Sequence, residues 1–274
     1  MGTLSSQSYS ILFIHYGSQC PWIPWMRKQV KQAAKSLKIK LRIINLMKNP
    51  HAASDNRIYF PFVTIINQHQ RIHAPISSSK LIQIITQGLK DKWDRHTELL
   101  QAEATYIEPI NSQNIKQTCQ VCIPQVQNIQ PLAKMQWALR ISQSVKNNLL
   151  GYIAYNHHHT PVGAIEILPS SLVPYPIPYK SYQHAFITCL YSFSVSHVLD
   201  KGVDYRAHLL KHAFHHLPTY GYDTIQIVAG KTRAFPNGPA SFLVKQGFKI
   251  AKHLQTIKLA DGTEDIIFLE YDLL

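Results

Sequence analysis

The sequence has few cysteines and no long apolar segment. Four cysteines in 274 residues are too few for the disulfide framework that many small secreted proteins depend on. No apolar run reaches the roughly 18 residues that a membrane-spanning helix needs. The first residues also lack a basic stretch followed by an apolar one, so we expect no signal peptide and no transmembrane segment. These absences favour a cytoplasmic chain with reduced thiols.

Acidic residues are also scarce: 28 Lys and Arg stand against 15 Asp and Glu, a formal net charge of +13. The imbalance is concentrated in residues 1–100, which hold 14 basic and 4 acidic residues. Such a segment indicates an anionic partner, such as nucleic acid, phosphates or an acidic membrane surface. A basic surface that only keeps the protein soluble explains the same charge. Gly2 and Ser6 fit the short N-myristoylation pattern, which would add a lipid anchor.

Residues 1–88 predict a small α/β domain. Apolar runs indicate strands at 10–15, 40–46, 62–67 and 70–73, and helical periodicity indicates helices at 24–38 and 77–87. A polar loop is expected at 49–56. The first helix carries a stripe of cations on one side, formed by Arg27, Lys31, Lys35 and Lys38.

Cys20 stands between the first strand and the first helix, and Pro61 precedes the third strand. In this arrangement residues 9–88 resemble the thioredoxin fold, which carries its active cysteine and its cis-proline at these places. The second active-site cysteine is missing, because Ile23 occupies its position. Dithiol exchange within the motif is therefore excluded. Cys20 either acts as a single thiol, whose pKa the helix N-terminus lowers, or packs beside the neighbouring tryptophans.

Residues 104–274 predict a second α/β domain, after a charged linker at 89–103. The expected elements are a strand, a broken helical region, a hairpin, a proline-rich loop, a long strand, a helix, a strand, a short helix and two closing strands. The most informative of these are the long strand at 185–195, the helix at 203–217 and the glycine-bearing loop between them. Unpaired amides and the partial positive charge at a helix N-terminus bind phosphate groups.

A second helix after this loop ends in Gly247 and Phe248. In this order of elements residues 104–274 resemble GNAT N-acetyltransferases, closest to the YoaP-like proteins, which place a small thioredoxin-like module after such a domain. The resemblance implies an α/β (α+β) fold with a central mixed sheet and, without a metal, transfer of acetyl from acetyl-CoA to a small-molecule or peptide amine in a ternary complex. It implies cofactor contacts by Phe193, Ser194, Val195, Lys201, Gly202, Val203, Asp204, Tyr205, Arg206 and Asn237.

The sequence departs from the family at two functional places. Asp204 stands where a loop glycine usually meets phosphate, and it either opposes the phosphate or caps the following helix. Leu243 and Val244 stand where many members have a tyrosine that protonates the leaving thiolate. Loss of such an acid lowers the rate about 100- to 10,000-fold if nothing replaces it. The alternative is a weakly catalytic or inactive GNAT-like binding module, whose basic N-terminal domain docks on nucleic acid or an anionic surface.

Candidate catalytic residues lie on the hairpin and the long strand. Glu166 is the candidate general base, and a surface carboxylate is the competing interpretation. His184 is a second candidate base, and Tyr191 is a candidate donor to the thiolate. Cys119 and Cys122 have Cys-x-x-Cys spacing but no second pair at zinc-ribbon distance, so helix packing explains them better than a metal.

Overall fold

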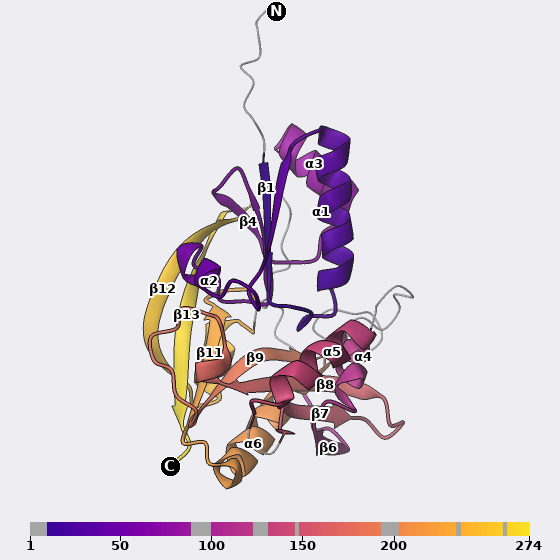
Figure 1. Ribbon diagram of the computed structural model, residues 1–274. Coiled ribbons are helices and arrows are strands. Elements are labelled where there is room, and N and C mark those ends of the chain that lie inside the picture. Colours follow the sequence, from indigo (N-terminus) through magenta and orange to yellow (C-terminus); the bar gives the residue numbers. More distant parts are fainter. Residues whose placement is uncertain are drawn as a thin grey trace, which may run out of the picture.

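The computed structural model describes residues 10–88, 100–122, 131–145, 148–192, 203–233, 237–259 and 262–274. A four-stranded sheet forms in the N-terminal unit, and a seven-stranded sheet runs through the rest of the chain. Figure 1 shows the first unit stacked on the second. None of the helices in the described ranges combines the length and the apolar character that a membrane crossing needs.

The first unit, residues 10–88, has the predicted β-α-β, then β-β-α order, with one additional short helix. Its strand order is β2-β1-β3-β4, with β1 parallel to β2 and the other neighbours antiparallel. The elements are β1 (Ser10–His15), α1 (Ile23–Leu37), β2 (Lys40–Asn45), α2 (His51–Asp55), β3 (Phe62–Ile66), β4 (Gln70–Ile72) and α3 (Ser78–Gln87).

Helices α1 and α3 pack together on one face of this sheet. Met26 and Val30 of α1 follow helical spacing and are fully buried. The backbone N–H of Ile76 donates to the sulfur of Met26 (3.2 Å), and the backbone N–H of Ser78 donates to the side chain of Gln29 (2.8 Å). These two bonds fix the start of α3 beside α1.

The second unit is built on a mixed sheet with strand order β12-β13-β11-β9-β8-β7-β6. Its strands are β6 (Tyr106–Pro109), β7 (Gly151–Tyr155), β8 (Pro161–Pro169), β9 (His184–Ser192), β11 (Thr224–Gly230), β12 (Lys249–Leu259) and β13 (Gly262–Asp272). Its α-helices are α4 (Thr118–Cys122), α5 (Pro131–Ser142), α6 (Arg206–His216) and α7 (Ala240–Lys245). Strands β9 and β11 are parallel, and all other neighbours in this sheet are antiparallel.

Both faces of the seven-stranded sheet are covered. Leu209 of α6 and Leu243 of α7 belong to the apolar cluster on one face. Trp137 of α5 belongs to the cluster on the other face, together with residues of the first unit such as Tyr16. Strand β8 is consequently buried along its whole length.

The two units share one hydrophobic cluster. The ring of Tyr16, just after β1, lies edge-on to Trp137 and Tyr175, with centroid distances of 5.8 and 6.0 Å. The long β12–β13 hairpin also reaches along the first unit (Figure 1), where Gln255 donates to the carbonyl of Arg57 (3.1 Å). The predicted linker therefore separates two sheets whose cores are joined.

Several predicted features differ in the structure. The segment predicted as a polar loop contains α2, because Ala52 and Ala53 turn into the core there. Helix α6 begins three residues later than predicted, since Val203–Asp204 forms β10, which pairs in parallel with β5 (Leu100–Gln101) at the end of the predicted linker. The cis peptide in the described ranges is Gly238–Pro239, so the cis-proline implied for Pro61 is wrong.

Candidate functional site

The parallel strands β9 and β11 separate partway along their length. Their pairing joins His184–Ile187 to Thr224–Ile227 and then ends. Strand β9 nevertheless runs on to Ser192, and β11 runs on to Gly230. A shift in the β8–β9 register leaves Thr188 as an extra residue in β9, and such a bulge bends a strand and disrupts its ladder. This gap leaves strand edges to which another extended group can bond.

Asn237 occupies part of the gap. Its Oδ1 accepts the backbone N–H of Leu190 on β9 (2.8 Å), and its Nδ2 donates to the carbonyl of Val228 on β11 (3.2 Å). One amide side chain can serve both strands because it carries an acceptor and two donors. This predicted cofactor-binding residue therefore lies between the diverging strands, bonded to their edges.

The loop between β9 and α6 is described only in its last part. Five predicted cofactor-binding residues lie outside the described ranges, namely Phe193, Ser194, Val195, Lys201 and Gly202. The next part begins at Val203 in β10. Tyr205, just before α6, donates its backbone N–H to Oγ of Ser192 at the end of β9 (3.1 Å). This bond holds the N-terminus of α6 beside the gap.

Asp204 and Arg206 form a buried ion pair at the start of α6. The Asp204 carboxylate accepts the backbone N–H of Arg206 (2.9 Å) and its Nη2 (2.8 Å). The guanidinium also donates to the carbonyl of Gly238 (2.7 Å) and lies 4.3 Å from the centre of the Phe242 ring. Asp204, one residue before the N-cap Tyr205, thus accepts the first backbone N–H of the helix. The Arg206 guanidinium is engaged inside the protein.

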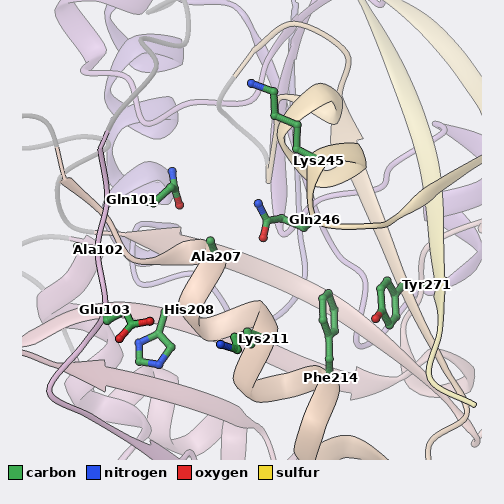
Figure 2. Close-up of a pocket in the computed structure, with 10 residues that line it drawn as sticks. All are labelled: Gln101, Ala102, Glu103, Ala207, His208, Lys211, Phe214, Lys245, Gln246 and Tyr271. Carbon is green, nitrogen blue, oxygen red and sulfur yellow. The ribbon is translucent and has the colours of Figure 1, made fainter.

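A pocket of about 480 Å³ lies beside α6, a size within the range of small-molecule and cofactor sites. Figure 2 shows side chains of α6 on one side of it and those of Lys245 and Gln246 across from them. The lining comes from four separate parts of the chain: Gln101, Ala102, Glu103, Ala207, His208, Lys211, Phe214, Lys245, Gln246 and Tyr271.

The pocket lining suits an anionic ligand that carries an aromatic ring. Lys211 and Lys245 contribute two cations, against the single carboxylate of Glu103. The rings of Phe214 and Tyr271 stack with a centroid distance of 3.9 Å and an interplanar angle of 4°. Figure 2 shows Lys211 close to these rings and Lys245 farther away, on the other side of the pocket.

Glu166, the predicted general base, forms an ion pair with Lys134 of α5. The Lys134 and Glu166 side chains are 1% and 6% exposed, so the competing prediction of a surface carboxylate is wrong. Burial alone would lower the pKa of Lys134, but the Glu166 carboxylate and two nearby cysteines raise it above its usual value. Lys134 is therefore charged, and Glu166 is its counter-ion. Glu166 can take a substrate proton only if this pair loosens.

The four cysteines of the chain all interact electrostatically with this ion pair. Cys189 stands directly opposite the glutamate in the β8–β9 register, Cys119 and Cys122 lie on α4, and Cys20 comes from the first unit. Burial raises the pKa of every one of these thiols. The lowered pKa predicted for Cys20 is therefore wrong, and its packing interpretation agrees with its apolar neighbours. Within the described ranges, no group of three His, Cys, Asp or Glu side chains could hold a metal ion.

The other two candidate catalytic residues lie near opposite ends of β9. His184 is at the start, in the paired part, with Nε2 3.8 Å from the carboxylate of Asp223. Five residues of strand, about 17 Å, separate it from Cys189. Tyr191 lies beyond the point of divergence, opposite Ala164 and against the same apolar cluster as the first unit. The structure therefore brings Tyr191 to the gap and leaves His184 away from it.

No family model and no curated protein matches the sequence. Solved structures resemble part of it. An N-acetyltransferase from Staphylococcus aureus Mu50 is 15% identical with a TM-score of 0.43, and the match covers 62% of this chain and 98% of that chain. A ribosomal-protein-alanine N-acetyltransferase from Brucella melitensis is 12% identical with a TM-score of 0.41, and the match covers 61% of this chain and 99% of that chain. An aminoglycoside 6′-N-acetyltransferase complexed with coenzyme A is 13% identical with a TM-score of 0.38, and the match covers 62% of this chain and 98% of that chain. Scores below 0.5 do not establish a common fold.

Sequence reasoning missed Lys134 and the pocket. A signal for Lys134 existed, because it shares one helix face with the buried Trp137 and Ala138. A lysine on an apolar helix face indicates a buried partner. The pocket had no comparable signal, since four separate segments form its wall.

Proposed function

We propose that residues 104–274 form a GNAT-like domain that transfers acetyl from acetyl-CoA to an amine. The observation that carries the proposal is the divergence of β9 from β11, with the N-terminus of α6 held beside the gap. An extended pantetheine arm fits such a gap and can bond to the free edge of β9. Helix N-termini bind phosphate groups through their amides and partial positive charge. The amides of Tyr205 and Arg206 are already bonded within the protein, so the pyrophosphate would depend on the later amides of the first turn and on the helix charge.

The pocket beside α6 supports a location for the nucleotide end of the cofactor. Lys211 and Lys245 would pair with phosphate oxygens, and the stacked Phe214 and Tyr271 would support the adenine ring. At the other end of the cofactor, the pantetheine arm would replace Asn237 as the hydrogen-bond partner of Leu190. Asn237 would then keep its bond to the carbonyl of Val228 on β11.

In the proposed reaction the acceptor amine attacks the thioester carbonyl directly. The C–N bond forms, the C–S bond breaks, and the amine loses a proton as the coenzyme thiolate leaves. Glu166 is the proposed proton acceptor, once its ion pair with Lys134 loosens. Tyr191, beyond the point of divergence, is the proposed proton donor to the thiolate. It would replace the tyrosine that many family members carry where this chain has Leu243 and Val244.

A second candidate function is a binding module with little catalysis. Arg206 favours it, because its guanidinium is already bonded to Asp204 and Gly238 and adds no charge to a phosphate site. Val244 favours it as well, since its half-exposed side chain cannot donate a proton. This module would keep the shape of the acyltransferase domain.

We also propose that residues 10–88 form a thioredoxin-like unit without dithiol chemistry. Its support is the strand order β2-β1-β3-β4 and the position of Cys20 before α1. Gln19 of the same loop accepts a hydrogen bond from the hydroxyl of Tyr175 in the second unit (3.2 Å). The proposed role of this loop is therefore to cover the face of the large sheet that carries Glu166.

The test of acyl transfer uses the full-length protein with acetyl-CoA and a panel of amines. The panel contains amino acids, amino-acid amides, peptides, polyamines and aminoglycosides, and chromatography measures the free coenzyme A that each releases. We expect at least one amine to release coenzyme A faster than the reaction without an acceptor does. Binding of acetyl-CoA without release would favour the second candidate, and the absence of both would exclude acyl transfer.

A further inference from the structure

The first unit carries a strongly cationic surface that acyl transfer does not use. Residues 10–88 contain eleven Lys and Arg and a single acid, Asp55. Seven of these cations are exposed and follow one another along α1 and β2: Arg27, Lys28, Lys31, Lys35, Lys38, Lys40 and Arg42. None of the seven forms an ion pair with a residue in the described ranges. We refer to these seven residues as the α1–β2 surface.

The cations of α1 lie on the side of the helix that faces away from α3. Gln29 marks the α3 side, because its side chain accepts the backbone N–H of Ser78 (2.8 Å). Arg27, Lys31 and Lys35 repeat every four residues and so form a row along the helix. This row spans about 12 Å at 1.5 Å per residue. The chain then turns directly into β2, an edge strand of the four-stranded sheet. Lys40 and Arg42 alternate with Leu41 and Ile43, which pack in the cluster with α1, so these two cations lie on the face of the sheet away from α1. The seven cations therefore flank the β2 edge from both sides.

The seven residues of the α1–β2 surface are all cations, and the partly exposed Trp22 and Trp25 at the start of α1 pack edge-on against each other within the apolar cluster. The apolar side of α1, with Met26 and Val30, is buried in the core. The large exposed hydrophobic side chains of the described ranges all lie outside residues 10–88. A helix that lies on a membrane presents an apolar face to the lipid, and proteins that hold single strands stack the bases on aromatic rings. Neither requirement is met here.

A row of cations alone matches the regular phosphates of a duplex backbone. We propose that the α1–β2 surface binds double-stranded nucleic acid through its phosphates, without reading the base sequence. Because all seven residues are Lys or Arg, the interaction is electrostatic. Its strength should therefore depend on salt in proportion to the number of phosphates contacted.

The number of phosphates contacted sets how steeply the affinity falls with salt. If five of the seven cations contact phosphates, log K falls with log salt concentration with a slope of about −4.5, or about 500-fold between 50 and 200 mM salt. The measurement is fluorescence anisotropy of a labelled 20-base-pair duplex of mixed sequence, titrated with the full-length protein at several salt concentrations.

Two variants with equal loss of charge localise the binding. The test variant carries Lys28→Gln, Lys31→Gln and Lys35→Gln, and glutamine retains good helix propensity. The matched control removes three exposed lysines of other elements: Lys116→Gln, Lys252→Gln and Lys258→Gln. In the test variant the slope of log K against log salt concentration should be about −1.8, and duplex binding at 50 mM salt should be more than tenfold weaker than in the wild type. The control should bind like the wild type.

Duplex binding that is absent or independent of salt would overturn the proposal, and so would an equal loss of duplex affinity in the two variants. It would also be overturned if the wild type bound anionic phospholipid vesicles but no duplex, and the test variant lost the vesicle binding. Circular dichroism and thermal melting of both variants establish that they are folded. Acetyl-CoA binding should be unchanged in the test variant, so that failure here is distinct from failure of the acyltransferase proposal.

Discussion

Lys134 of α5 and Glu166 of β8 form an ion pair with almost no contact with solvent. Removing two charges from water costs several kcal/mol for each ion, and their mutual attraction must compensate for that cost. Each partner therefore depends on the other. The pair also links α5 to β8, on which Glu166 stands opposite Cys189 of β9.

Replacing one partner should destabilise the protein strongly. Lys134→Met would leave Glu166 buried without a counter-ion, and we expect the free energy of unfolding to fall by about 3–5 kcal/mol. Urea denaturation measures this change. The double variant Lys134→Met/Glu166→Leu should recover most of the loss, because it removes both charges. A single variant within about 0.5 kcal/mol of the wild type would show that the pair is not buried as described.

Tyr191 should affect the chemical step and leave cofactor binding unchanged. Tyr191→Phe keeps the ring that packs against the apolar cluster and removes the proposed proton donor. We expect kcat to fall about 100- to 10,000-fold, with the Kd for acetyl-CoA within twofold of the wild-type value. The control Tyr182→Phe, at an exposed position, should keep full activity. Equal kcat values in Tyr191→Phe and the wild type would remove Tyr191 from the mechanism.

Much of the fold follows from local patterns in the sequence. The apolar run at 10–15 corresponds to β1, and the periodic pattern at 24–38 corresponds to α1 within one residue at each end. Helix α2 was not predicted, because a five-residue helix has too few turns to show periodicity and its alanines are buried by tertiary contacts.

The candidate site was predictable only in outline. The sequence placed Glu166 on a strand, but β8 is buried on both faces, so no alternation indicated which way its side chain points. The extra residue Thr188 and the gap beyond it arise from pairing between strands distant in sequence. The roles of Lys134 and Asn237 depend on the same long-range packing.

His73 should make the protein sensitive to acid. It is buried, neither ring nitrogen has a hydrogen-bond partner, and burial lowers its pKa to about 3. The unfolded chain, with a pKa near 6.5 at this residue, binds a proton between these values while the folded protein does not. The stability that neutral His73 contributes is complete above pH 6.5. As the pH falls below 6.5, the free energy of unfolding decreases by about 1.4 kcal/mol per pH unit.

The variant His73→Phe removes this titration. We expect its free energy of unfolding to fall less steeply than that of the wild type between pH 6.5 and 4.5, by roughly the slope of one histidine. Urea denaturation at several pH values provides the comparison. Parallel pH curves for the two proteins would mean that His73 titrates normally in the fold.

The central claim is that the pocket beside α6 receives the nucleotide end of acetyl-CoA. Isothermal titration calorimetry of acetyl-CoA into the wild type, the double variant Lys211→Gln/Lys245→Gln and the control Lys252→Gln tests it most directly. Each charge-assisted contact contributes about 1.5 kcal/mol, so the double variant should bind about 150-fold more weakly. The control should bind like the wild type. No binding by the wild type at near-millimolar acetyl-CoA, or equal affinity in all three proteins, would contradict the claim.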